Sequence, residues 1–273
     1  MLINLKQNLL DLSQPRIMGI LNITPDSFYK GNRFTDLSKV LDRAEKMLSE
    51  GATFLDIGGH STRPGASPVS EEEELNRVLP VVEAIIQKFP EALISIDTFR
   101  SSVAKKCVEA GAVIINDVSG GILDDKMFET VASLGVPYVL MHMRGTIETM
   151  TQMTNYDDLV TDVLDDLQKK VYQLRQLGQK DIIIDLGFGF AKTADQNYVL
   201  LKHLEDFRLL DCPMLVGVSR KSMIWRKLDI SPNDSLNGST VLNTVALMKG
   251  ANILRVHDVK EAMETIKLIS FLG

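Results

Sequence analysis

The sequence predicts an α/β protein whose eight parallel strands and their helices close into a (β/α)8 barrel, the TIM barrel. Eight short apolar runs alternate with amphipathic segments along the chain. Polar residues that end these runs recur at steps of roughly 34 residues, the length of one strand-and-helix unit. The chain has 273 residues, close to the ~250 typical of such barrels.

Each expected strand is apolar almost throughout and ends in polar residues or glycine. The absence of inside-outside alternation is typical of parallel strands that are covered on both faces. In chain order, the expected strands are 16–24, 54–59, 93–98, 113–119, 138–143, 182–187, 214–219 and 253–258.

Segments with apolar residues at helical spacing lie between the strands, at 37–52, 71–89 and 156–178. The acidic run 71–74 is expected to favour the start of its helix and to stay solvated. Glycines 51, 111, 135, 178 and 250 each precede a strand and are expected to end helices in a left-handed conformation. No linker divides the chain, so residues 1–273 are expected to form one domain, with the barrel proper from about 16 to 273. A doubly wound open sheet is the alternative.

Composition narrows the classes of function. The formal net charge is -6 and the sequence has no basic stripe, which argues against nucleic acid as a partner. Every apolar run is shorter than the ~20 residues that cross a bilayer, and the N-terminus does not resemble a signal peptide. Cys107 and Cys212 fall in no metal or disulfide spacing, which suits a reducing compartment. We therefore expect a cytoplasmic protein without a membrane segment.

Chemically diverse polar residues stand at or near the ends of the expected strands. In a barrel, these strand ends meet at the face that carries the catalytic loops. Side chains from all eight units are therefore expected to converge on one mouth. They are Asn22, Asp56, Asp97, Asn116, His142, Asp185, Ser219, Arg255 and His257.

Two neighbourhoods of different charge can be distinguished in this mouth. Asp97, Asn116 and Asp185 suit a planar heterocycle edge rich in N–H donors, such as a pterin or a guanine, and Lys221 could donate to a ring carbonyl. A second group, Arg63, Arg255 and His257, can surround an anion. Together they indicate a group transfer with an anionic leaving group.

Eight motifs in order resemble those of the dihydropteroate synthase family. They are NITPDSF (22–28), DIGGHSTRPG (56–65), SIDT (95–98), NDVSGG (116–121), MHMRG (141–145), GFGF (187–190), SRKS (219–222) and RVHDV (255–259). The resemblance runs from about residue 16 to the C-terminus. It implies a barrel enzyme, a transferase, that joins 7,8-dihydropterin pyrophosphate to p-aminobenzoate and releases pyrophosphate. Expected with it are Mg²⁺, sulfonamide binding and a homodimer formed through the last helices.

The resemblance also implies roles for single residues. Those expected in catalysis are Asp97, Asp185, Lys221, Arg255 and Arg63. Substrate-binding residues are expected to be Thr62, Arg63, Asp97, Asn116, Met141, Asp185, Phe190, Ser219, Lys221, Arg255 and His257, while Asn22 is expected to contact the metal. Loops 24–28 and 61–65 are expected to close over the substrates. Because pyrophosphate leaves readily when its charge is held, an SN1-like substitution without a protein nucleophile is expected.

The chain departs from the family pattern in several places: His60 replaces a glutamate, Leu186 a proline, Ala191 a glycine, and YKGNRF (29–34) stands where SDGGRF is more common. Two alternatives stay open. One is a pterin-binding paralogue without catalysis. The other is the barrel of the methyltetrahydrofolate-dependent methyltransferases, which is expected to lack the STRPG and SRKS loops found here.

Overall fold

The structure, a computed structural model, describes the whole chain except residues 6–7, 24–32, 61–68 and 273. Eight parallel strands close into a barrel in the order β10-β3-β4-β5-β6-β7-β8-β9, which confirms the (β/α)8 prediction and excludes an open sheet. The strands are β3 (Arg16–Asn22), β4 (Phe54–Gly58), β5 (Leu93–Asp97), β6 (Ile114–Asp117), β7 (Tyr138–Met141), β8 (Ile182–Asp185), β9 (Met214–Val216) and β10 (Ile253–Val256).

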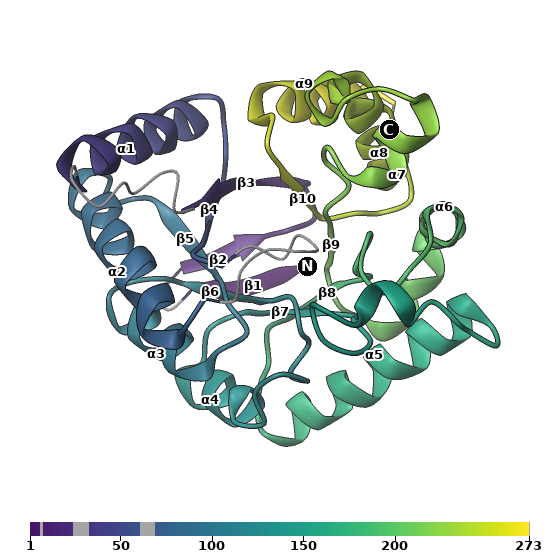
Figure 1. Cartoon of the computed structure of the whole chain (residues 1–273), viewed down its shortest axis with the longest axis horizontal. Coiled ribbons are helices and arrows are strands. Elements are labelled where there is room, and N and C mark those ends of the chain that lie inside the picture. The colour runs from purple at the N-terminus through teal and green to yellow at the C-terminus, as the bar shows by residue number, and fades with distance from the viewer. Residues whose placement is uncertain (6–7, 24–32, 61–68, 273) are drawn as a thin grey trace.

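Helices surround the barrel as an outer ring (Figure 1). They are α1 (Arg33–Ser49), α2 (Glu71–Lys88), α3 (Ser101–Glu109), α4 (Met127–Leu134), α5 (Leu159–Gln176), α6 (Ala194–Lys202), α7 (Ser222–Leu228), α8 (Leu236–Met248) and α9 (Val259–Ile269). Short 3-10 helices lie at η2 (Met150–Gln152), η3 (Leu204–Leu210) and η4 (Pro232–Asp234). Helix α5 begins three residues later than expected, because the Asp158 carboxylate accepts from the Thr161 N–H at 2.9 Å and caps the helix there.

The five glycines that were expected to end helices all have positive φ. At Gly111, φ is 118°, and an added Cβ would lie 2.4 Å from the Ile86 Cδ1 atom. Glycine is therefore required at this junction both for the backbone conformation and for the close approach of α2.

The acidic run at the start of α2 is only partly solvated. Glu71, Glu72 and Glu73 are exposed as expected, whereas Glu74 is fully buried. Its carboxylate accepts from the Thr98 hydroxyl at 2.6 Å and pairs with Arg100. The expectation of a solvated side chain was wrong for Glu74, because the helical repeat turns this position inward and an ion pair compensates its burial.

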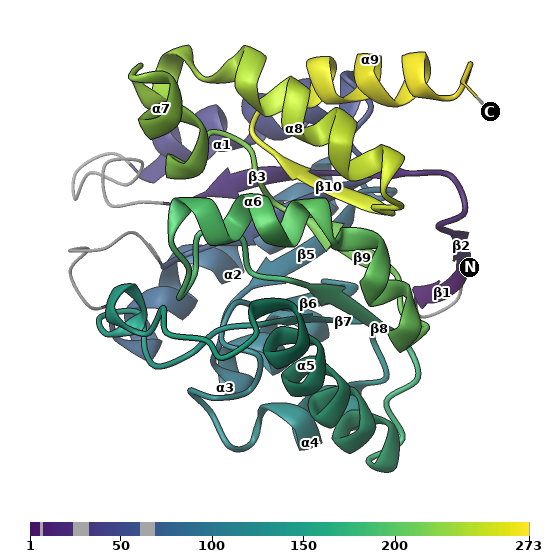
Figure 2. The same ribbon diagram turned by 90° about the vertical axis from the view of Figure 1, so that its right-hand side faces the viewer.

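An N-terminal hairpin, β1 (Leu2–Leu5) and β2 (Asn8–Asp11), was not foreseen. Ile3, Leu5 and Leu12 are buried against the apolar residues inside the lower barrel, and the Asn252 side-chain amide donates to the Leu12 carbonyl at 2.9 Å. Figure 2 shows the hairpin at the opposite end of the barrel from α7. It closes the end at which the strands begin.

Alternation along the strands separates an apolar layer from a polar one. Phe54, Ile114, Ile183 and Ile253 belong to the apolar cluster that includes the hairpin. Two residues further along the same strands, where the side chain again points inward, stand Asp56, Asn116, Asp185 and Arg255. The polar layer thus lies at the carboxyl ends of the strands. None of the helices in the described part of the chain is long and apolar enough to cross a membrane.

Candidate active site

Arg255 lies at the centre of the polar layer and pairs with two carboxylates. Its Nε donates to the Asp56 Oδ2 and its Nη2 to the Asp97 Oδ2, each at 2.6 Å. Burial opposes the charged guanidinium, but the carboxylates of Asp56 and Asp97 outweigh it and raise the pKa of Arg255 above its ordinary value. The predicted convergence of these strand ends is therefore confirmed for β4, β5 and β10.

Asp56 holds this group together, and sequence reasoning placed it at the mouth without giving it a role. Its side chain is fully buried, and its Oδ2 also accepts from the Asn116 Nδ2 at 3.0 Å. The other oxygen, Oδ1, has no hydrogen-bond partner within the described residues. The signal was available, since Asp56 is the strand-end carboxylate that opens the DIGGHSTRPG motif.

Asp97 and Asp185 are the carboxylates best placed to receive a ligand. Their β-strand neighbours are Asn116 and Met141 respectively. Asp97 has 14% of its side chain exposed, and burial raises its pKa to about 7 although Arg255 favours the charged form. Burial also raises the pKa of Asp185, whose Oδ1 accepts from the Gly187 N–H at 2.8 Å. Among the described residues, no hydrogen bond engages Asp97 Oδ1 or Asp185 Oδ2.

Apolar side chains line the mouth beside these carboxylates. Met141, Met143 and Val118 are buried in one cluster, and Phe190 packs against it. Flat or flexible apolar surfaces of this kind suit the faces of a ring whose edge is held by polar groups. The structure brings Met141 and Phe190, both expected around the ring, into this one cluster.

Lys221 enters the mouth from the turn that follows β9. Its Nζ donates to the Phe188 carbonyl and lies 4.9 Å from the centre of the Phe190 ring. Burial lowers the pKa of Lys221 to about 8, while the nearby Asp185 favours its charged form. Lys221 is thus held against the loop that also carries Phe190.

A second buried lysine, Lys192, binds backbone carbonyls of the loop that carries Phe190. It was not identified from the sequence. Its Nζ is 2.9 Å from His142 Nδ1, 3.0 Å from the Phe190 carbonyl and 3.2 Å from the Gly187 carbonyl. Burial lowers the pKa of Lys192 to about 7. Burial and the Lys192 charge lower the pKa of His142 to about 2, so His142 is a neutral acceptor.

Ser219 and His257 link the ends of β9 and β10. The Ser219 Oγ accepts from the His257 backbone N–H at 3.2 Å and lies 3.1 Å from His257 Nδ1. Burial, with the charge of Arg255, lowers the pKa of His257 to about 4. We assign the Ser219 hydroxyl as the donor to Nδ1, which leaves the His257 Nε2–H as a neutral hydrogen-bond donor.

The residues expected to hold a metal offer few ligands. Asn22, the last residue of β3, is exposed and paired in register with Gly58. No group of three or more His, Cys, Asp or Glu side chains that could hold a metal occurs in the described ranges. One amide oxygen fits Mg²⁺ only where substrate phosphates and water supply the other ligands.

Thr62 and Arg63, together with loops 24–28 and 61–65, lie outside the described residues. His60, one of the departures from the family pattern, stands just before the second of these loops. Its ring packs edge-on to Phe99 at 5.3 Å between centroids, and its buried Nδ1 has no hydrogen-bond partner among the residues that the structure describes. Burial, together with the Arg100 charge, lowers the pKa of His60.

Comparisons with known proteins show the family to which the chain belongs. The family model described as pterin binding enzyme matches residues 18–257. The chain is 44% identical over 262 residues to dihydropteroate synthase of Escherichia coli strain K12, covering 95% of this chain and 92% of that protein. It superposes with a TM-score of 0.92 on the crystal structure of Yersinia pestis dihydropteroate synthase with a sulfonamide drug complex, at 43% identity and 100% and 99% coverage.

The structure also resembles dihydropteroate synthase from Xanthomonas albilineans in complex with 7,8-dihydropteroate. The TM-score is 0.88 and the identity 34%, with 100% of this chain and 98% of that chain covered.

Proposed function

The chain belongs to the dihydropteroate synthase family of pterin-binding enzymes, and from this premise we infer that it catalyses the family's reaction. It joins 7,8-dihydropterin pyrophosphate to p-aminobenzoate, forming 7,8-dihydropteroate and pyrophosphate. One observation carries the inference. The Asp56–Arg255–Asp97 group, with Asn116 bonded to it, stands at the carboxyl ends of the barrel strands.

Asp97, Asn116 and Asp185 bind the edge of the pterin ring. The Asp97 Oδ1 and the Asp185 Oδ2 accept from ring N–H and exocyclic amine groups, and Asn116 can both donate and accept. Lys221 donates to the ring carbonyl after exchanging its bond to Phe188. Met141 and Phe190 pack on the ring, and Arg255 lies against it from its position between Asp56 and Asp97.

The diphosphate is bound by the cationic half of the site. Arg255 and the Nε2–H of His257 contact it, with Arg63 completing the set. As the bond between the pterin methylene carbon and the diphosphate oxygen breaks, positive charge develops on the carbon and ring. The buried carboxylates stabilise that charge because the site is shielded from water. The p-aminobenzoate nitrogen, placed by Thr62 and Ser219, then attacks this carbon and loses a proton.

The reaction needs no protein nucleophile. We expect no covalent bond between enzyme and pterin at any stage. Mass spectrometry of the quenched enzyme should therefore find the unmodified chain, and a pterin adduct would contradict the SN1-like course.

Mg²⁺ fits this site as an ion carried by the diphosphate, with the Asn22 amide oxygen as a protein contact. When bound, it would neutralise charge on the leaving group.

Pyrophosphate release tests the proposed function. The purified protein is supplied with dihydropterin pyrophosphate and Mg²⁺, with or without p-aminobenzoate. Release should depend on p-aminobenzoate and fall ~100-fold or more in Arg255→Ala, because an electrostatic contact to developing charge is lost. Arg175→Ala on α5, which removes a guanidinium far from the mouth, is the matched control and should retain activity.

Three outcomes contradict the proposal. Undiminished release in Arg255→Ala would remove its central residue. Pterin binding without release would indicate the paralogue that lacks catalysis. Methyl transfer from methyltetrahydrofolate would indicate the methyltransferase alternative.

We also propose a homodimer formed by α8 and α9, which pack side by side in Figure 2. Helices α8 and α9 and the segment after α9 carry several exposed apolar side chains: Val241, Met248, Leu268, Phe271 and Leu272. A second copy of the chain would cover them. Changing both Leu268 and Phe271 to Glu should give monomers in sedimentation velocity, whereas Tyr172→Glu on α5 should leave the dimer intact.

We also propose a cytoplasmic location, which the buried free thiols of Cys107 and Cys212 support.

A further inference from the structure

Arg220 stands between two residues of the site, Ser219 and Lys221, in an unusual backbone conformation. Its φ is 54°, in the left-handed region. Asp211 and Asp229 share this region, but a short polar side chain tolerates it better than the long side chain of arginine does. The surrounding structure must therefore hold Arg220 in place.

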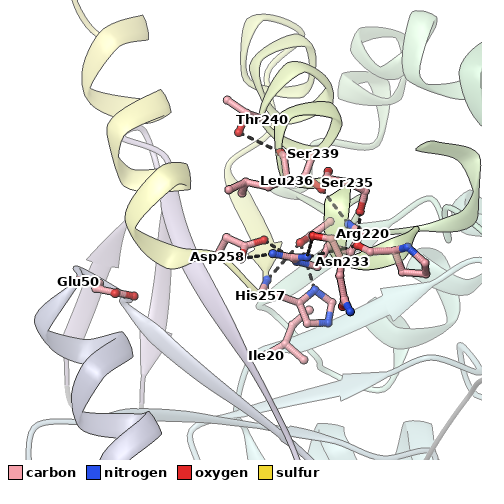
Figure 3. A network of polar contacts seen from close by, with 12 residues as sticks. Ile20, Glu50, Arg220, Asn233, Ser235, Leu236, Ser239, Thr240, His257 and Asp258 are labelled. Atoms are coloured by element: carbon pink, nitrogen blue, oxygen red, sulfur yellow. Dashed lines mark hydrogen bonds and ion pairs between the residues drawn. The ribbon is translucent and has the colours of Figure 1, made fainter. Parts of the chain in front are cut away.

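The guanidinium of Arg220 is bound on every edge (Figure 3). Its Nε and Nη2 donate to the two oxygens of Asp258, both at 2.8 Å, in a bidentate pair. Its Nη1 donates to the carbonyls of Pro232 and Asn233, at 3.2 and 2.7 Å. Arg220 thus joins the β9–α7 turn to η4 and to the start of α9.

The main chain of Arg220 is held as well. Its N–H donates to the Ser239 hydroxyl at 2.9 Å, and that hydroxyl donates to the Ser235 carbonyl at 2.8 Å. The first turn of α8 therefore fixes the left-handed residue from the opposite side.

Asp258 binds Arg220 and does not cap helix α9. It occupies the N-cap position of α9, yet its side chain makes no capping hydrogen bond. Both its oxygens are taken by the guanidinium. Asp258 directly follows His257, and His257 contacts Ser219, the residue before Arg220. The loops after β9 and β10 are therefore joined by two contacts. One is Ser219 with His257 in the site, and the other is Arg220 with Asp258 outside it.

We propose that the Arg220–Asp258 pair is a clasp that positions Ser219, Lys221 and His257 for the reaction. Neither member of the clasp contacts the substrates. The clasp sets the separation between the β9 and β10 loops, on which binding of the diphosphate and of p-aminobenzoate depends. This inference rests on the proposed function.

Three variants separate the effect of losing the Arg220–Asp258 ion pair from the effect of changing the backbone of the turn. Arg220→Gly removes the guanidinium but accepts the positive φ without strain. Asp258→Asn keeps the size of the side chain and leaves residue 220 unchanged. The double variant removes both partners. Lys249→Met is the control, because it breaks a comparable ion pair, 2.7 Å to Glu205, remote from the mouth.

Both single variants should lower kcat/KM for p-aminobenzoate by ~10- to 100-fold, the effect of a displacement of about 1 Å. The double variant should resemble each single one, since both remove the same interaction. Affinity for 6-hydroxymethylpterin, which lacks the diphosphate, should fall less than kcat/KM does, because Lys221 is the one pterin contact that depends on the clasp, whereas Asp97, Asn116 and Asp185 belong to other strands. Lys249→Met should show wild-type kinetics.

A folded Asp258→Asn with wild-type kcat/KM would overturn the clasp. So would losses that multiply in the double variant, or an Arg220→Gly variant that matches wild type, which would show that only the turn matters. Hydrogen exchange gives a readout independent of activity. Amides in 217–223 and 256–260 should exchange faster in either single variant, even if the wild type releases no pyrophosphate. Unchanged exchange in both segments would refute the clasp, while absence of release alone would refute only the proposed function.

Discussion

At the scale of single residues, neighbouring positions on one strand have opposite roles. Asn116 points into the barrel and bonds to Asp56, whereas Asp117 points outward. The Asp117 carboxylate accepts from the Tyr138 hydroxyl at 2.7 Å and from the backbone N–H of Ser119 at 2.7 Å. Because side chains alternate along a strand, the register alone separates the site residue from the structural one.

The pH dependence of pterin binding should follow Asp97. Its pKa, about 7 in the folded protein against 3.8 ordinarily, means that the folded state holds this proton more tightly than the unfolded state. Its contribution to stability is thus greatest at low pH and is lost as pH rises from about 4 to 7. The ring edge needs the charged form as acceptor, so affinity for 6-hydroxymethylpterin should weaken as pH falls below about 7.

Calorimetry between pH 5.5 and 8 measures this dependence without the ionisation of a diphosphate. Asp97→Asn should bind weakly and with little variation over the same range. A wild-type affinity that is constant from pH 5.5 to 8 would contradict the role assigned to Asp97.

At the scale of elements, the loop from Gly187 to Ala191 shows how a departure from a family pattern is accommodated. Ala191 has a φ of 50° where the family pattern has glycine. Its carbonyl accepts from the Tyr156 hydroxyl at 2.9 Å, and Lys192 binds the carbonyls of Gly187 and Phe190. These contacts hold the loop shape that glycine would adopt readily.

Ala191→Gly should change the free energy of unfolding by less than ~1 kcal/mol. Relief of the left-handed alanine, about 1–2 kcal/mol, is offset by the greater freedom of glycine in the unfolded chain and by the loss of a buried methyl group. Ala104→Gly, buried in α3, lacks that relief and should destabilise by ~1–2 kcal/mol. Urea unfolding of both variants compares them, and equal losses would show that residue 191 is unstrained.

At the scale of the whole molecule, the hairpin closes one end of the barrel, and the polar layer around Arg255 lies at the other end. Leu12 is fully buried beneath the barrel, and Leu9 on the same hairpin is 70% exposed. One face of the N-terminal segment is therefore buried against the barrel, and the other face is exposed to solvent.

Leu12→Ala should lower the free energy of unfolding by ~2–4 kcal/mol, because it leaves a cavity in a packed layer. Leu9→Ala should change it by no more than ~0.5 kcal/mol, as an exposed substitution does. Urea unfolding measures both. Similar values for the two would mean that the hairpin does not pack against the barrel.

Much of the fold followed from local patterns. The eight strands were predicted from apolar runs, three helices from the spacing of their apolar residues, and five helix ends from glycines that precede a strand. Each of these patterns lies within a short stretch of the sequence. The hairpin escaped prediction because its burial depends on Phe54, Ile114 and Ile253, which are distant in sequence. Glu74 was misjudged for the same reason, since its partner Arg100 lies on another element.

By itself, the sequence determined the barrel and the set of polar residues at its mouth, because the βα repeat obliges every strand to end on the same face. The tertiary structure decided how those residues pair. Closure of the barrel brings Arg255 to Asp56 and Asp97, Lys192 to His142 and Arg220 to Asp258. These pairings depend on distances between elements far apart in the chain, which no local pattern records.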